Sequence, residues 1–222
     1  EEFKIIFYWE YFHRLLGRLI GLIFLLPLIF FSIKKLFDSK MLIILYFIFF
    51  LICAQGLMGW YMVESGLVEN TSVSHYRLSA HLLLAFIIIS LLTWNYLNHV
   101  NGKYKVFFNL KNKMTKILFF LIMFQIILGA FVSGLDAGLI YQTWPKMNLS
   151  YFPDDITIDG DNFIHLLSNQ SFVQFLHRSL AYLIIILAVI LGIKMFKEKQ
   201  NDYLKNYFFV LFVLLTQVLL GI

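Results

Sequence analysis

The chain has 222 residues, of which 60% are hydrophobic and only 14% are charged. A water-soluble fold of this length cannot bury so much apolar surface, so lipid must be the solvent for most of the chain. The formal net charge of +5 does not indicate a nucleic-acid partner, because the lysines fall in short segments between long apolar runs. The single cysteine, Cys53, excludes an intrachain disulfide and is interpreted as a small core residue.

Six apolar segments are long enough to cross a bilayer as helices, because a span needs about 20 residues. They cover residues 12–33, 41–63, 76–97, 115–135, 173–194 and 204–222. Lysines follow the first, third and fifth segments, whereas acidic residues dominate the connections 64–75 and 136–172. The basic connections are therefore predicted to lie inside and the acidic ones outside. The long connection 136–172 is predicted to be an external cap or binding loop.

The sequence also contains an internal repeat. The stretch EYFHRLLGRLI around His13 aligns with QFLHRSLAYLI around His177, and the helices that follow end in QGLMG and QVLLG. A third copy, QIILG, lies in the fourth span, which favours a repeating unit of four helices. The predicted fold is an all-α polytopic membrane protein with two pseudo-symmetric four-helix bundles when intact. The present chain, which starts without methionine and stops in an apolar run, is expected to be a fragment that lacks the first and last transmembrane helices and keeps six.

This repeat divides the chain into three parts. Residues 1–100 are predicted to form the amino-terminal bundle, with helices 2 to 4 of the intact protein. Residues 101–113 are predicted to be a cytoplasmic or matrix loop. Residues 114–222 are predicted to form the carboxy-terminal bundle, with helices 5 to 7 and the external loop.

Three histidines fall within the predicted spans near their outer ends. His13 is expected to begin the first span, His81 to lie about one and a half turns into the third, and His177 to begin the fifth. A polar group in a span is costly and is a functional candidate by default. Imidazole is a strong iron ligand, and facing helices of a bundle can hold a cofactor between two side chains. His13 and His81 are thus a candidate axial pair; the alternative is that each histidine is an interfacial residue that water or a carbonyl satisfies.

The neighbours of His13 fit a flat macrocycle. Glu10, His13, Gly17 and Gly21 share one helical face, where the small residues leave room for a porphyrin. Within the repeat, Glu10 aligns with Gln174, and only a carboxylate can take a proton or stabilise a cation. The first bundle is therefore predicted to be reactive and the second structural. The alternative for Glu10 is a charged residue that the helix dipole favours near a helix start.

The remaining polar residues of the spans have simpler interpretations. Arg14 and Arg178, directly after two of the histidines, match haem propionates in charge and geometry; their alternative role is interfacial anchoring. Gln55, Gln125 and Gln217 are predicted to form interhelical hydrogen bonds beside glycines rather than to bind substrate.

These motifs resemble those of the haem A synthases, in particular the alphaproteobacterial and mitochondrial form. The matching stretches are YWEYFHRLLGRLIG at 8–21, QGLMGWYMVESGL at 55–67, VSHYRLSAHLLLA at 73–85, GAFVSGLDAGLIYQTWPKMN at 129–148 and FLHRSLAY at 175–182. They extend through nearly the whole chain. The loop GLDAGLIYQTWPKMN together with the ExxHR helix is the most specific part of the resemblance.

The resemblance implies an oxidoreductase that converts the C8 methyl group of haem O to a formyl group, giving haem A for cytochrome c oxidase. It implies that Glu10 is the required glutamate and that His13 and His81 are iron ligands of the haem O site in the amino-terminal bundle. His177 would be one axial ligand of haem b in the carboxy-terminal bundle, whose second ligand would lie beyond Ile222. The expected location is the bacterial inner membrane, rather than the mitochondrial one.

The ligands implied are haem O and haem A, in a lipid bilayer. The protein partners implied are haem O synthase and assembly components of cytochrome c oxidase, and a homo-oligomer is a further option. No nucleic-acid partner is expected. Two other functions remain open at this point. The first is a non-catalytic di-haem b-type electron-transfer or haem-carrier membrane protein that uses the same histidines only to hold cofactor. The second is a transporter whose polar residues line a path.

Overall fold

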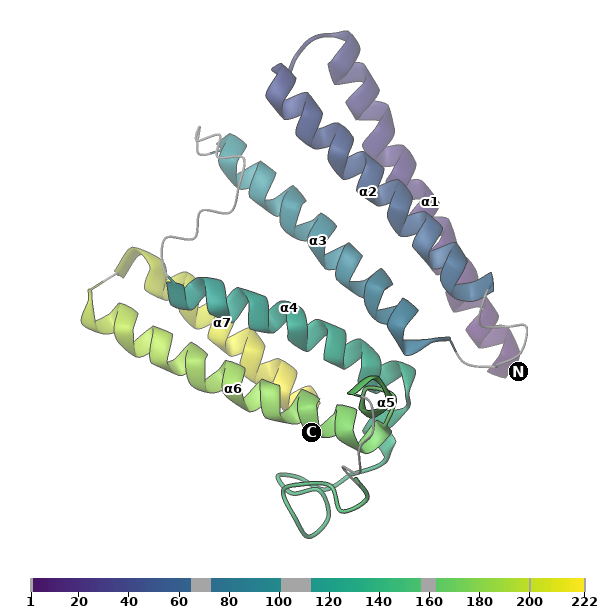
Figure 1. The fold of residues 1–222 in the computed structure, drawn as a ribbon. Helices are drawn as coiled ribbons and strands as arrows, with labels where there is room; N and C mark the ends of the chain where they lie inside the picture. The colour runs from purple at the N-terminus through teal and green to yellow at the C-terminus, as the bar shows by residue number, and fades with distance from the viewer. Residues whose placement is uncertain (1, 65–72, 101–112, 157–162, 200, 222) are drawn as a thin grey trace. The chain divides into compact units, whose positions relative to one another are not determined.

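The computed structural model describes residues 2–64, 73–100, 113–156, 163–199 and 201–221. Its elements are α1 (Glu2–Ile33), α2 (Ser39–Glu64), α3 (His75–Val100), α4 (Lys113–Gly134), η1 (Ala137–Leu139), α5 (Phe163–Leu166), α6 (Gln170–Lys197) and α7 (Asn201–Leu220). Figure 1 shows them along the chain. Over the described residues there is no strand, only an isolated bridge between Met147 and Ser150. The prediction of an all-α fold is therefore confirmed.

Five helices are long and apolar enough to cross a membrane, and they correspond to the first five predicted spans. Their spanning parts are Phe7–Ile33, Ser39–Val63, His75–Val100, Lys113–Gly134 and Gln170–Lys197. The sixth predicted span also forms a helix, but its apolar part, Leu204–Leu220, is shorter than the other five. Helices are the expected outcome for such segments, because each satisfies its backbone polar groups internally. The chain is thus a multi-span membrane protein.

Two helices begin earlier than hydropathy predicts. Helix α1 starts at Glu2, so His13 lies about three turns inside it. Helix α6 starts at Gln170, after an amino-terminal cap in which the Asn169 side chain accepts a hydrogen bond from the Phe172 N–H at 2.9 Å. Both helices thus extend beyond the predicted spans 12–33 and 173–194, so neither His13 nor His177 is the first residue of its helix. Hydropathy marks the apolar stretch, whereas capping residues and backbone preferences decide where a helix begins.

The chain divides into two compact units, each described here by itself. The first contains residues 1–71 and 84–106, and the second contains residues 72–83 and 107–222. The first turns of α3 thus group with the second unit and the rest of α3 with the first. The predicted internal loop 101–113 lies outside the described residues, apart from Lys113.

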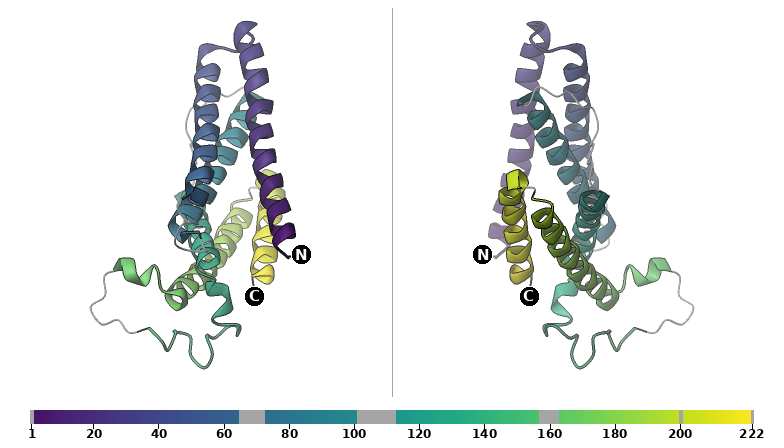
Figure 2. Two further views of the ribbon diagram at one scale, coloured as in Figure 1. Left: turned by 90° about the vertical axis from the view of Figure 1, so that its right-hand side faces the viewer. Right: turned by 90° about the vertical axis from the view of Figure 1, so that its left-hand side faces the viewer.

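In the first unit, α1 and α2 lie side by side (Figure 1 and Figure 2). The rings of Phe24 and Phe49 stack between them with centroids 6.4 Å apart. Near the connecting turn, the hydroxyl groups of Ser32 and Tyr46 lie 2.9 Å apart and share a hydrogen bond. Close packing of two apolar helices with one polar contact is the usual way in which such helices associate.

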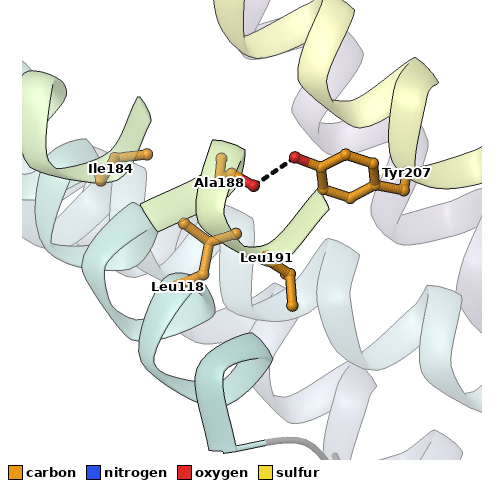
Figure 3. Close-up of a cluster of buried hydrophobic side chains, with 5 residues drawn as sticks. All are labelled: Leu118, Ile184, Ala188, Leu191 and Tyr207. Carbon is orange, nitrogen blue, oxygen red and sulfur yellow. Dashed lines mark hydrogen bonds between the residues drawn. The ribbon is translucent and has the colours of Figure 1, made fainter. Parts of the chain in front are cut away.

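In the second unit, the core lies where α4, α6 and α7 meet (Figure 3). Its buried members are Leu118 from α4, Ile184, Ala188 and Leu191 from α6, and Tyr207 from α7. The Tyr207 hydroxyl donates a hydrogen bond to the Ala188 backbone carbonyl, so the polar end of this buried ring is satisfied. The first turn of α3 also packs on this unit, where His75 and Tyr76 contact the ring of Phe131 edge-on.

Candidate functional site

One face of α1 carries the candidate amino-terminal site. Glu10, His13, Gly17 and Gly21 follow one another at helical spacing, and Glu10 and His13 are exposed. A Cβ atom added at Gly17 or Gly21 would meet no atom within 4 Å in the described part of the chain. The space beside these two glycines is therefore open in the described part of the chain, where residues 11–20 are all exposed. This leaves room for a ligand beside His13.

Glu10 is paired on the same helix. The Arg14 guanidinium donates to Oε2 of Glu10 at 2.6 Å, and both side chains are about half exposed. Glu10 lies about two turns after the first residue of α1, beyond the first turn to which a dipole effect extends. The helix dipole therefore does not account for this glutamate. The contact with Glu10 leaves other guanidinium N–H donors of Arg14 for the predicted propionate.

The first turns of α3 hold two further histidines in the second unit. His81 is half-buried there. Nε2 of His75 is buried and has no hydrogen-bond partner among the described residues, while the ring packs against Phe131. Gly134, at the end of α4, is tightly enclosed by this turn: an added Cβ would lie 2.9 Å from the Cα and Cβ of His75. Glycine is therefore needed at this crossing of α3 and α4.

His177 contacts α4 through its imidazole ring. The Gln125 side-chain nitrogen lies 3.1 Å from Nδ1, 3.3 Å from Nε2 and 3.0 Å from the His177 carbonyl oxygen. One turn along α4, an added Cβ at Gly129 would come 3.3 Å from Cε1 of the same ring. The structure thus confirms the predicted interhelical hydrogen bond of Gln125 beside a close-packed glycine. Its partner, His177, was not predicted.

Several side chains of α6 hold the loop after α4, among them Gln174 and Arg178. Gln174 is buried, and its side-chain nitrogen donates to the carbonyl of Tyr141 at 3.0 Å and lies 3.5 Å from that of Gly138. Arg178 donates to the Tyr141 carbonyl at 2.6 Å and to the Thr143 carbonyl at 2.8 Å. Loop carbonyls need N–H donors, which an amide supplies and a carboxylate does not. This explains why the repeat has glutamine where the first copy has Glu10.

A second set of hydrogen bonds, centred on Asp155, holds the same loop to α6. The Tyr141 hydroxyl donates to Oδ1 of Asp155 at 2.7 Å, and the Ser171 hydroxyl donates to Oδ2 at 2.5 Å. These two hydrogen bonds hold the pKa of the Asp155 carboxyl below its ordinary value, that from Ser171 most strongly. Burial, followed by the hydrogen bond to Asp155, raises the pKa of the Tyr141 phenol. We call Tyr141, Asp155, Ser171, Gln174 and Arg178 the loop latch.

Sequence reasoning missed Tyr141, Asp155 and Ser171 as members of this latch. One signal was available: Ser171, Gln174 and Arg178 recur at three- and four-residue spacing, so they form a polar stripe on an otherwise apolar helix. Figure 2 shows the loop at the end of α4 and at the start of α6. A cavity of about 190 Å³ lies beside the latch, between Met147 and Tyr151 of the loop and Phe175 and Tyr182 of α6. It is smaller than typical small-molecule sites, which occupy about 300–1,000 Å³.

Together these features define a helical multi-span membrane protein in which histidines on three helices, one with a nearby carboxylate, form the candidate ligand-binding groups. A model of the family described as "Cytochrome oxidase assembly protein" matches residues 1–222. The heme A synthase of Pelagibacter ubique is 49% identical over the whole chain. Those of Wolbachia pipientis wMel and Rickettsia bellii are 42% and 40% identical, also over the whole chain. The chain belongs to this family, the haem A synthases.

The chain spans 65%, 63% and 67% of the lengths of these three relatives, respectively. No solved structure gave a significant match to it.

Proposed function

We propose that this chain provides the central part of a haem A synthase, a membrane oxidoreductase that oxidises the C8 methyl group of haem O to a formyl group. The observation that carries the proposal is the match of the whole chain to the family, combined with Glu10 and His13 on one uncovered face of α1. The product, haem A, would serve cytochrome c oxidase. The relatives are bacterial, which supports a location in the bacterial inner membrane.

The substrate site is proposed on α1. His13 and His81 are the proposed ligands of the haem O iron, as the resemblance implies. Gly17 and Gly21 present no Cβ that would lift a macrocycle off the helix. Bundle proteins hold cofactors by imidazole ligation of this kind, and these two histidines would hold the haem O iron.

Glu10 is the proposed catalytic residue because it is the carboxylate on this face. Its Oε2 accepts the hydrogen bond from Arg14, so Oε1 is the atom proposed to accept a proton from the substrate side. The ion pair places Arg14 beside Oε2, because the two residues lie four apart on one helix. General-base action requires a carboxylate oxygen within hydrogen-bond reach of the reacting group.

The second site is proposed for haem b, which when bound would supply a redox centre that relays electrons. His177 is its proposed axial ligand. The residues fit this role, because Gly129 makes room for the imidazole and the buried Oε1 of Gln125 is without a partner in the described part of the chain. Arg178 is the proposed propionate contact, using guanidinium donors beyond those that hold the loop.

The test is replacement of Glu10 in the full-length protein. Glu10→Gln and Glu10→Ala should abolish conversion of supplied haem O to haem A, while the purified variants keep the haem b absorbance that depends on His177. Extracted haems would be separated by chromatography. Glu198→Gln, at the exposed residue directly after α6, is the matched control and should convert haem O normally. Full conversion by the Glu10 variants would remove Glu10 from the mechanism, and a wild-type protein that returns haem O unchanged would favour the haem-carrier function instead.

A further inference from the structure

The loop between α4 and α6 folds back along the first turns of α6. The carbonyls of Tyr141 and Thr143 accept hydrogen bonds from Arg178, which lies about 12 Å along the helix from its first residue. Met147 of the loop lines one cavity together with Tyr182, which lies about 18 Å along the same helix. This part of the loop therefore lies beside α6.

This level of α6 is one boundary of its membrane-spanning part. The helix has 28 residues and is therefore about 42 Å long, whereas the hydrocarbon core of a bilayer is about 30 Å thick. Arg178 is the last charged residue before Lys194, so the uncharged segment between them is the part that fits the hydrocarbon. The loop residues beside Arg178 and Tyr182 therefore lie where lipid headgroups meet acyl chains.

Leu149 lies at the tip of a tight turn in this part of the loop. The Met147 N–H donates a hydrogen bond to the Ser150 carbonyl at 2.8 Å, and the Asn148 N–H donates one to the Thr143 hydroxyl at 2.8 Å. Met147 is buried at the base of the turn, whereas Leu149 is 88% exposed. Turns that face water usually carry glycine or small polar residues. A leucine at the tip of a hydrogen-bonded turn favours contact with lipid instead.

The same part of the loop exposes further large apolar side chains. Those of residues 139–152 that are between 41% and 88% exposed are Leu139, Ile140, Trp144, Leu149, Tyr151 and Phe152. Tryptophan and tyrosine are enriched where membranes meet water. Lys146, the one lysine between residues 136 and 172, lies 5.7 Å from the centre of the Tyr151 ring. Its charge complements the phosphate groups of lipids.

A loop at this depth needs partners for its backbone polar groups, because acyl chains offer none. Arg178 binds the carbonyls of Tyr141 and Thr143. Gln174 also donates to the Tyr141 carbonyl, and the Thr143 hydroxyl donates to the Lys146 carbonyl at 3.0 Å. Carbonyls that are satisfied in this way can approach lipid without a large desolvation cost.

We propose that this loop binds the lipid surface, with Leu149 and its exposed apolar neighbours in the headgroup–acyl boundary of the leaflet at the start of α6. The lipid-facing side of α6 continues this surface, because Tyr182 and Ile186 are exposed and follow Phe175, which lines the loop cavity, at helical spacing. The proposal needs only the membrane-spanning fold, so it stands apart from the proposed haem chemistry.

The test is the depth of a nitroxide label at position 149 of the full-length protein in vesicles of phosphatidylcholine and phosphatidylglycerol. Leu149→Cys is labelled in a background that carries Cys53→Ser and lacks other cysteines. Collision with oxygen, which concentrates among acyl chains, is compared with collision with a water-soluble nickel chelate. Ile186→Cys, at an exposed residue of the span, is the lipid reference, and Glu198→Cys, at the exposed residue after α6, is the water reference.

The ratio of the oxygen to the nickel collision rate at position 149 should exceed the ratio at position 198 several-fold and lie between the two references. Because Leu149 is so exposed, its replacement should leave the helicity and the melting temperature unchanged. A ratio equal to that at position 198 would place the turn in water and overturn the proposal. A label that neither reagent reaches would also overturn it, because a second copy or another protein would then cover the turn.

Discussion

The side chains of Tyr141 and Asp155 meet at 2.7 Å, a hydrogen bond within a loop that also reaches α6 through Ser171. Tyr141 is nearly fully buried, with 5% of its surface exposed, although it belongs to a loop. Its backbone carbonyl accepts from both Gln174 and Arg178, so both lone pairs are used. Tyr141 therefore connects the loop to α6, the helix that carries His177, in two ways. Its backbone carbonyl binds Gln174 and Arg178, and its hydroxyl binds Asp155, which in turn binds Ser171.

Removal of the Tyr141 hydroxyl should loosen this loop. Tyr141→Phe keeps the buried ring and leaves Asp155 with one hydrogen bond fewer, at an expected cost of about 1 kcal/mol in unfolding free energy. Thermal unfolding of the purified full-length protein and limited proteolysis within residues 141–156 would show it. Tyr151→Phe is the matched control, because Tyr151 is in the same loop but exposed. Equal protease resistance of Tyr141→Phe and the control would contradict a latch at Tyr141.

The latch should also respond to acid. Because the pKa of Asp155 in the folded protein lies below its ordinary value of 3.8, its stabilising contribution is complete above about pH 4. It is lost as the pH falls through the lowered pKa. The raised pKa of Tyr141 makes the loop sensitive to alkaline pH as well. The contribution of the Tyr141 phenol to stability is complete below pH 10 and is lost as the pH rises through the raised pKa.

Hydrogen exchange of the loop peptide across pH would measure this response. Loop protection should drop only below about pH 4, and Asp155→Asn should lack that acid transition. An acid transition that survives in Asp155→Asn would assign it to another carboxylate.

Glu10 and Gln174 align in the internal repeat. Replacing each by the residue type of the other should lower stability by unequal amounts. Gln174→Glu places a buried carboxylate against loop carbonyls, and an unpaired buried charge costs about 3 kcal/mol or more. Glu10→Gln breaks only an exposed ion pair, which contributes little. Thermal unfolding monitored by fluorescence would compare the Gln174→Glu and Glu10→Gln variants. Gln142→Glu, at an exposed position of the loop, is the control. Similar melting temperatures for Gln174→Glu and Glu10→Gln would show that Gln174 is not a structural anchor.

The sequence predicts much of this fold because lipid imposes a simple rule. A segment such as 41–63 has to be helical, and α2 is. Helix ends follow local capping instead: Asn169 starts α6 ahead of the apolar stretch. The latch could not be predicted in full, because the partners of Arg178 lie 35 and 37 residues earlier in a loop without periodicity.

Gly192, the glycine of α6, should be sensitive to substitution. A Cβ atom added there would lie 2.5 Å from a ring carbon of Tyr207, which is held in place by its hydrogen bond to Ala188. Gly192→Ala should therefore lower the unfolding free energy by about 1–3 kcal/mol through overpacking of the α6–α7 contact. Gly56→Ala on α2 is the matched control, since an added Cβ meets nothing within 4 Å there, and it should melt at or slightly above the wild-type temperature.

A double-mutant cycle separates this clash from a general effect on the helix. Tyr207→Leu shortens the side chain that opposes Gly192, so Gly192→Ala should cost less in that background than in the wild type. The coupling energy would be obtained from thermal unfolding of the four proteins in one detergent. If alanine at position 192 costs the same with tyrosine and with leucine at position 207, the α6–α7 contact does not depend on a close approach of the ring to the glycine, and the tight packing at this crossing would be refuted.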